Sequence, residues 1–280
     1  LLSYTQNKGD AIVIDSQMNC RYKFGLVVSA SDGAAVRIKP ENSGPDDFVV
    51  TTVSTFDFSA ICSPGGLGTS KGTGLVIDST GGPILNNKII AEETSTHVLG
   101  VYLTDGGGSG NLIAHNSVDV RYNQQYHAPS GPCTNLRVGD PGSSMIVHNK
   151  IDMSLHAPIG AYFDEEAKRY RIPDVFSPPV DAIGADIFGQ RNLMTLACYG
   201  KRAQGNDVIF RPDAQENTIF SLNLPNGVTN LAKIPTNRVV TNGPVGFRVE
   251  TPGVPRSGQD LVNVTPYTVQ ILFVSGGNVS

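Results

Sequence analysis

The sequence predicts an all-β protein built as a solenoid, in which short strands wind into stacked coils. Three observations support this fold class. Related short segments recur along the chain, no segment has the apolar spacing of a helix, and Val, Ile and Thr are plentiful. The 31 glycines and 18 prolines among 280 residues indicate many turns.

The first family of recurring segments consists of short strands that end in a polar or turn residue. Each member begins with a small or short residue and then alternates apolar and variable positions. The starts lie 24 to 39 residues apart, which is the repeat length of a β-solenoid coil. The members are AIVIDS (11–16), AVRIKP (35–40), GLVIDS (74–79), GVYLTD (100–105), NLRVGD (135–140) and GAYFDE (160–165).

A second family alternates with the first between residues 74 and 165. It contains ILNNKII (84–90), LIAHNSV (112–118) and MIVHNKI (145–151), and its shared asparagines are Asn87, Asn116 and Asn149. We expect these asparagines to stack at one corner of successive coils, where each amide can bond to its copies above and below. His115 and His148 precede two of them and are expected to be corner residues, not metal ligands.

Composition and motifs exclude several classes of function. The formal net charge is −4 and no block of Lys or Arg stands out, so nucleic acid is not expected as a partner. No apolar run approaches the ~20 residues that cross a bilayer. The sequence contains no phosphate-binding loop, no G-x-S-x-G, no H-E-x-x-H and no EF-hand loop. Neither a cofactor nor a metal is expected.

The pattern resembles the right-handed parallel β-helix of the pectate-lyase-like superfamily, and more narrowly a bacteriophage tailspike or tail-fibre protein. The resemblance covers roughly residues 9–220 and includes GNDVIFRPDAQENTIFS (205–221). It implies a β-helix over 1–222, with a loop insertion near 165–184. It also implies a small C-terminal antiparallel region over 223–280 that forms a homotrimer, and a place on the virion, outside the cell.

In a parallel β-helix, equivalent positions on successive coils lie about 4.8 Å apart, so outward side chains form columns. One outward column reads Val76, Tyr102, Arg137 and Tyr162. Tyrosine faces and a guanidinium suit sugar binding. On a nearby loop, Arg121 and Tyr122 are further candidates for the rim of a sugar groove.

A second column stands at the ends of the same strands: Ser79, Asp105, Asp140 and Glu165. Paired carboxylates are the groups that glycosidases use, at about 5–5.5 Å in retaining enzymes and about 6.5–9.5 Å in inverting ones. We expect the catalytic residues to be Asp105, Asp140 and Glu165. Other carboxylates compete on the second strand family: Glu92, Glu93, Asp119 and Asp152, of which the last two are aligned with each other.

The expected function is recognition of a bacterial surface polysaccharide, a capsule or O-antigen, and its hydrolysis. Two alternatives stay open. The chain is a non-enzymatic receptor-binding or structural segment of a viral fibre, or it is a polysaccharide lyase in which Arg121 or Arg137 is the base.

Overall fold

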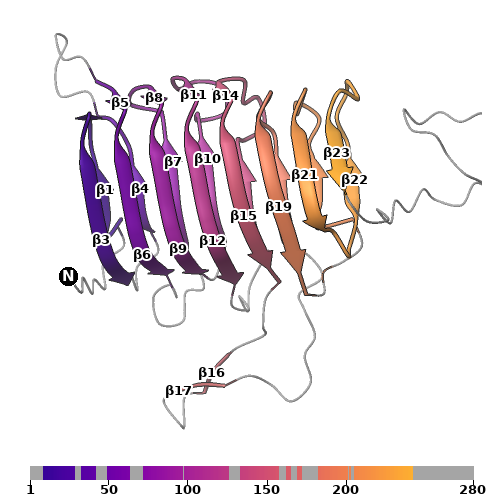
Figure 1. Cartoon of the computed structure of the whole chain (residues 1–280), viewed down its shortest axis with the longest axis horizontal. Helices are drawn as coiled ribbons and strands as arrows, with labels where there is room; N and C mark the ends of the chain where they lie inside the picture. Colours follow the sequence, from indigo (N-terminus) through magenta and orange to yellow (C-terminus); the bar gives the residue numbers. More distant parts are fainter. Residues whose placement is uncertain are drawn as a thin grey trace, which may run out of the picture. The chain divides into compact units, whose positions relative to one another are not determined.

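The computed structural model describes residues 9–28, 33–41, 49–63, 72–96, 98–125, 133–157, 162–164, 169–171, 182–200, 202 and 205–241. All of these residues belong to the first of two compact units, Leu1–Phe247. They contain strands and turns and no helix, which confirms the all-β prediction (Figure 1).

Three parallel sheets make up most of the structure. The first contains β1 (Ile12–Ile14), β4 (Ala34–Ile38), β7 (Thr73–Asp78), β10 (Leu99–Thr104), β13 (Thr134–Val138), β18 (Ile183–Ile187), β20 (Val208–Phe210) and β22 (Val228–Asn230). The second contains β2 (Gln17–Met18), β5 (Thr51–Thr52), β8 (Ile84–Leu85), β11 (Ile113–Ala114) and β14 (Ile146–Val147). The third contains β3 (Arg21–Val28), β6 (Thr55–Ser63), β9 (Lys88–Thr96), β12 (Ser117–Gln125), β15 (Lys150–His156), β19 (Leu193–Tyr199), β21 (Thr218–Asn223) and β23 (Arg238–Thr241).

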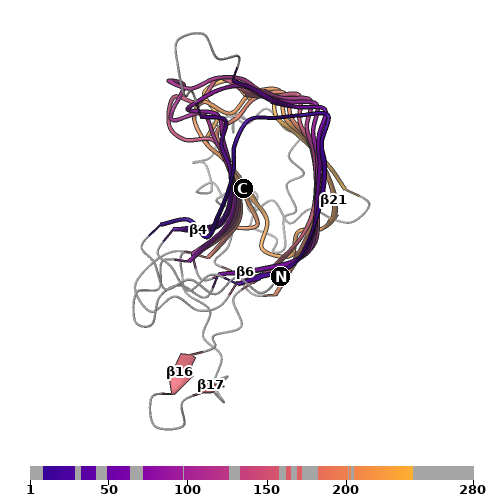
Figure 2. The same cartoon turned by 90° about the vertical axis from the view of Figure 1, so that its left-hand side faces the viewer.

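The chain visits the sheets in turn, and each coil gives one strand to the first sheet and one to the third. The first five coils also give one strand each to the second sheet. We call them sheets A, B and C in the order above. In sheet A, Val101 pairs with Leu75 of the coil before it and with Leu136 of the coil after it. In Figure 2 the traces of successive coils overlay one another. The described residues therefore form a parallel β-solenoid.

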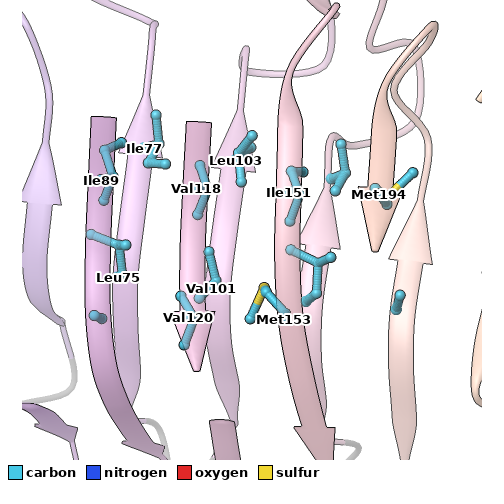
Figure 3. Close-up of a cluster of buried hydrophobic side chains, with 14 of the residues drawn as sticks. Leu75, Ile77, Ile89, Val101, Leu103, Val118, Val120, Ile151, Met153 and Met194 are labelled. Atoms are coloured by element: carbon cyan, nitrogen blue, oxygen red, sulfur yellow. The ribbon is translucent and has the colours of Figure 1, made fainter. Parts of the chain in front are cut away.

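The core lies between sheets A and C and is filled by the inward side chains of both. Leu75, Ile77, Val101 and Leu103 of sheet A lie close to Ile89, Val118, Val120 and Ile151 of sheet C (Figure 3). All of these side chains are fully buried. Burying them removes apolar surface from water on every coil, which is the main force that holds the stack together.

The asparagine ladder is confirmed and runs further than the sequence indicated. The Nδ2 of Asn87 donates to Oδ1 of Asn116 at 3.0 Å, and Asn116 donates to Asn149 at the same distance. The series continues through Asn192, Asn217 and Asn237. Each Oδ1 also accepts the backbone N–H of the preceding ladder residue, as Asn149 does from Asn116 at 3.1 Å.

The residue before each ladder position from Asn87 to Asn217 has a left-handed backbone conformation, which makes the corner before sheet C. The φ angles are 56° for Asn86, 58° for His115 and 56° for His148. Asn and His adopt this conformation more readily than most other non-glycine residues. His115 and His148 are thus corner residues, as expected, and their exposed rings stack on each other with centroids 5.4 Å apart.

Two predictions of organisation were wrong. The segment 160–165 is no coil strand, because β13 pairs with β18 and not with β16 (Tyr162–Asp164). Instead β16 pairs antiparallel with β17 (Arg169–Arg171), within the chain that links β15 to β18. The solenoid also does not end at residue 222, since β22 and β23 pair parallel with β20 and β21. The expected antiparallel C-terminal strands lie outside the described residues.

We expect the asparagine ladder to contribute strongly to the free energy of unfolding. The Asn149 side chain accepts from both nitrogens of Asn116, and its own Nδ2 donates to the Ile113 carbonyl at 2.9 Å. Changing Asn149 to Ala leaves these buried groups unpaired, and we expect a loss of about 3 kcal/mol or more in the free energy of unfolding. Denaturant unfolding, which measures the midpoint and slope, tests this.

Asn111 serves as the matched control, because it is exposed and its Nδ2 makes one bond, to the Ser79 carbonyl at 3.1 Å. Changing Asn111 to Ala should cost about 1 kcal/mol or less. Equal losses for the two variants would contradict a special role of the ladder.

Candidate functional site

The predicted sugar-binding column on sheet A is in register but is engaged in internal contacts. Tyr102 pairs with Arg137 as expected. The Tyr102 hydroxyl donates to Oδ2 of Asp140, and Arg137 donates to Oδ1 of the same carboxylate at 2.8 Å. The Arg137 guanidinium lies over the Tyr102 ring and over the Phe188 ring, at 5.6 and 5.3 Å from their centroids. These groups thus bind one another and have few free positions for a ligand.

The surroundings of Tyr102 also raise the pKa of its phenol. Burial is the larger cause, and the hydrogen bond to the Asp140 carboxylate adds to it, so that the pKa rises to about 12. The neutral Tyr102 phenol donates its proton to a hydrogen bond with Asp140, which indicates a structural role for Tyr102. Asp140, which accepts from Tyr102, Thr104 and Arg137, holds two neighbouring coils together.

Asp105, the first of the predicted catalytic carboxylates, is fully buried. Its Oδ1 accepts the Ser143 hydroxyl and the Gly108 N–H, and its Oδ2 accepts the N–H groups of Ser144 and Met145 at 3.1 and 2.9 Å. The Asp105 carboxylate thus accepts four hydrogen bonds and has no exposed surface. These bonds connect the glycine-rich turn to the next coil. This arrangement favours a structural role for Asp105.

Tyr162, the last member of the predicted sugar-binding column, does not lie on sheet A. Tyr162 lies on β16, which belongs to the separate two-stranded sheet. Glu165 lies outside the described residues. The structure therefore brings together Tyr102, Arg137 and Asp140, and it places Tyr162 in another sheet.

A different column, on the outer face of sheet C, carries carboxylates that line a groove. From Ile90 onward, each of its residues follows a ladder asparagine by three positions, and Asp57 pairs in register with Ile90. Asp119 pairs with Asp152, and Asp152 pairs with Thr195. The complete column is Asp57, Ile90, Asp119, Asp152, Thr195, Phe220 and Val240.

Two β-bulges open this groove. Val120 pairs with Met153 and Asn123 with Leu155, so Arg121 and Tyr122 together oppose Ser154 alone. On the other side, Leu222 is the extra residue of β21. Bulges re-aim side chains, and here Arg121 and Leu222 are exposed, Leu222 at 69%.

The groove has a volume of about 260 Å³. We call it the Asp119–Asp152 groove. Its lining residues are Asp119, Val120, Arg121, Asp152, Met153, Ser154, Thr195, Ala197 and Leu222.

Some charged groups around the groove form ion pairs and others do not. Oδ2 of Asp152 lies 3.0 Å from the Lys150 ammonium, and this hydrogen bond raises the pKa of Lys150. Oδ1 of Asp152 is buried and has no hydrogen-bond partner among the described residues. Asp119 likewise forms no hydrogen bond with another described residue. Arg121 is paired with Glu92 at 2.9 Å.

Aromatic side chains flank the groove in two ways. The His156 ring stacks on the Tyr199 ring of the next coil with centroids 4.8 Å apart, and the Tyr122 ring lies 4.3 Å from His156 at a tilt of 42°. Burial lowers the pKa of His156, as does the nearby charge of Arg202, so the ring is neutral at pH 7. Phe220, beside Thr195 in the groove column, is 45% exposed and is the better platform for a sugar ring.

Sequence reasoning noted the alignment of Asp119 with Asp152 but did not find Thr195, Phe220 or Leu222. One signal was present: Asn192 and Asn217 are followed three positions later by Thr195 and Phe220, in the spacing that relates Asn116 to Asp119. The sequence pattern does not predict the bulge that exposes Leu222.

The comparisons with known proteins give no family. The chain matches no protein-family model, no curated protein and no solved structure. Within the described part of the chain, no group of three or more His, Cys, Asp or Glu side chains could hold a metal ion. That same part contains no helix long and apolar enough to cross a membrane.

The state of Tyr102 can be tested by titration. Its folded pKa of about 12 lies above the value of about 10 expected for an unfolded chain. The stability that the neutral phenol contributes is therefore complete below about pH 10 and is lost as the pH rises toward 12. Ultraviolet titration of tyrosinate should show a late transition that the change of Tyr102 to Phe removes. If the late transition persists in this variant, it comes from another tyrosine, and the pKa of Tyr102 is not raised as described.

Proposed function

We propose that the chain binds a polysaccharide along the outer face of sheet C and hydrolyses it in the Asp119–Asp152 groove. One observation carries the proposal: two carboxylates from adjacent coils are in register and line one groove. Exposed Phe220 and Leu222 add apolar surface beside them. Polar groups beside an apolar face match a sugar ring, which has hydroxyl edges and a C–H face.

The spacing of the two carboxylates suits a retaining mechanism. Adjacent strands lie about 4.8 Å apart, and retaining glycosidases hold their carboxyl groups at about 5–5.5 Å. In this mechanism the Asp152 carboxylate attacks the anomeric carbon and forms a glycosyl ester, while the Asp119 carboxylic acid gives its proton to the leaving oxygen. Water then attacks the same carbon, gives a proton to Asp119 and releases Asp152.

The roles follow from the partners of each carboxylate. The Lys150 ammonium lies 3.0 Å from Oδ2 of Asp152, and we assign this paired carboxylate as the nucleophile. Asp119 forms no hydrogen bond to another described residue, and we assign it as the acid. A lyase is less well supported, because its candidate bases Arg121 and Arg137 are already paired with the carboxylates of Glu92 and Asp140.

We further propose that this protein is a right-handed β-helix of the phage tailspike type, carried on the virion as a homotrimer that attaches to capsule or O-antigen. Leu231 and Ile234, near the end of the described chain, are 50% and 49% exposed. The apolar alternation of YTVQILFV (267–274) supports the same idea from the sequence. Light scattering should give three times the chain mass of 29.7 kDa, and a monomer would contradict the trimer.

The hydrolytic proposal predicts the effect of removing each acid. Changing Asp119 or Asp152 to Asn should lower turnover of a bacterial surface polysaccharide by about 10²–10⁴, the usual contribution of general acid–base catalysis. Reducing-end assays measure this loss. Binding of the glycan should persist, because Phe220 and Leu222 remain.

Asp57 is the matched control, because it stands in the same column on β6, two coils from Asp119. Changing Asp57 to Asn should leave turnover unchanged. If both groove variants keep full activity, the groove is not the site of hydrolysis. If no variant and no wild-type chain cleaves but all of them bind, the protein is a receptor-binding fibre.

A further inference from the structure

We infer that Arg202 is a positioning residue for the Asp119–Asp152 groove, because its buried guanidinium holds β15 and β19 in the register from which the groove arises. This inference rests on the proposed function, since it names a residue that shapes the proposed site without lining it. It is carried by hydrogen bonds from one guanidinium to the main chain of both strands, by the bulges on either side of them, and by the burial of the ion pair that Arg202 forms.

The groove lies over two strands that are each one residue short of an outer neighbour. β15 pairs with β19 in one uninterrupted register. On one side β12 has an extra residue opposite Ser154, and on the other side β21 has Leu222 as an extra residue. Ser154 and Ala197, which pair with each other, line the groove between the two bulges. A local shift of either strand by one residue would restore regular pairing and remove the groove.

Main-chain oxygens beyond the two bulges accept hydrogen bonds from side chains. A bulge disrupts the ladder of hydrogen bonds locally, so the groups beyond it need other partners. Arg202 donates to the Leu155 carbonyl of β15 at 3.1 Å and to the Tyr199 carbonyl of β19 at 3.4 Å. Asn223, the first residue after the second bulge, donates to the Cys198 carbonyl at 2.9 Å. Arg202 thus connects both strands of the groove floor directly behind it.

The ion pair that holds Arg202 in place is wholly buried. The side chains of Arg202 and Asp207 are 0% exposed and lie 2.9 Å apart. The guanidinium also donates to Oδ1 of Asn135 at 2.7 Å, and the Asp207 carboxylate accepts the Asn226 N–H at 2.6 Å. A buried ion pair adds little net stability, because the cost of removing two charges from water offsets their attraction, and fixing a register is its best-attested use.

The register of β15 and β19 bears directly on the proposed chemistry. Asp119 and Asp152 stand on β12 and β15 just before the first bulge. If β15 shifts beyond this point, the groove wall moves relative to the two carboxylates, and a misplacement of about 1 Å can lower turnover about 10²-fold. Phe220 lies before the second bulge and pairs with Thr195, so its contact with the glycan should persist.

The test removes both charges at once, so that no lone buried charge remains. In the double variant Arg202→Met with Asp207→Asn, hydrogen exchange at the amides of 154–157 and 197–199 should be at least about tenfold faster than in the wild type. A hydrogen bond to a charged group contributes about this factor to local protection. The amides of Asn116 and Asn149 in the ladder are the internal reference and should exchange as before.

Turnover supplies a second readout. On a glycan that the wild type cleaves, the double variant should show a kcat per folded chain that is about 10–100-fold lower, with the folded fraction taken from circular dichroism. KM should change little, because Phe220 remains in place. A loss of stability alone would lower the folded fraction and leave kcat per folded chain unchanged.

Two further variants separate the forked contact from the charge. Arg202→Lys keeps a cation beside Asp207 but lacks the planar fork that reaches two strands, so the same amides should exchange faster. The matched control is Arg211→Met with Asp186→Asn, a second Arg–Asp pair whose atoms lie 2.5 Å apart and whose Asp186 belongs to sheet A. This control should leave exchange on sheet C and turnover unchanged.

The outcomes separate this inference from the proposed function. Wild-type exchange over 154–157 and 197–199 in the double variant or in the lysine variant would overturn the inference, and the lysine variant decides if the double variant does not fold. Equal acceleration at the ladder amides would also overturn it, because Arg202 would then support every coil alike. Faster exchange confined to the two strands, in a protein whose wild type cleaves no glycan, would support the role of Arg202 while the proposed function fails.

Discussion

The asparagine ladder is the interaction on which the rest of this structure depends. Each amide oxygen accepts both the backbone N–H and the side-chain N–H of the residue on the preceding coil, as Asn149 does from Asn116. The bonds are buried, so a slip of one coil by one residue would leave several polar groups unpaired at once. The ladder therefore sets the register of every coil that it crosses, and the apolar columns of the core follow from that register.

The candidate site is a consequence of the same register. Residues three positions after the ladder form one outward column, which is why Asp119, Asp152 and Thr195 stand side by side without any contact between distant loops. The two bulges then break the regular face on either side of the column. The ladder fixes the spacing of the side chains in this column, and the bulges shape the Asp119–Asp152 groove beside it. A linear polymer that crosses several coils meets groups at intervals of one strand spacing.

The sequence predicted the parts of the fold that repeat and missed the parts that occur once. The ladder positions Asn87, Asn116 and Asn149 were found because they recur at similar offsets. The segment 160–165 resembles a coil strand in its alternation, yet β16 pairs only with β17, because alternation describes any half-buried strand and does not specify its partner.

The candidate site was harder to predict than the fold. The sequence showed that Asp105 aligns with Asp140, but it did not show that Asp105 is buried. In the structure the buried Asp105 carboxylate accepts backbone N–H groups of the next coil, which is a structural role. Asp119 and Asp152 were recognised as aligned but were not preferred, because the hollow around them depends on bulges at Arg121–Tyr122 and Leu222. A bulge is one extra residue in a ladder of hydrogen bonds, and the sequence of either strand alone does not reveal it.

The most direct test of this account is a crystal structure of the protein soaked with an oligosaccharide that it binds. The account predicts electron density for sugar rings across β12, β15 and β19, between Arg121 and Leu222, with polar groups of the sugar facing Asp119 and Asp152. Sugar bound instead over Tyr102 and Arg137 on sheet A, with the Asp119–Asp152 groove holding only water, would contradict it.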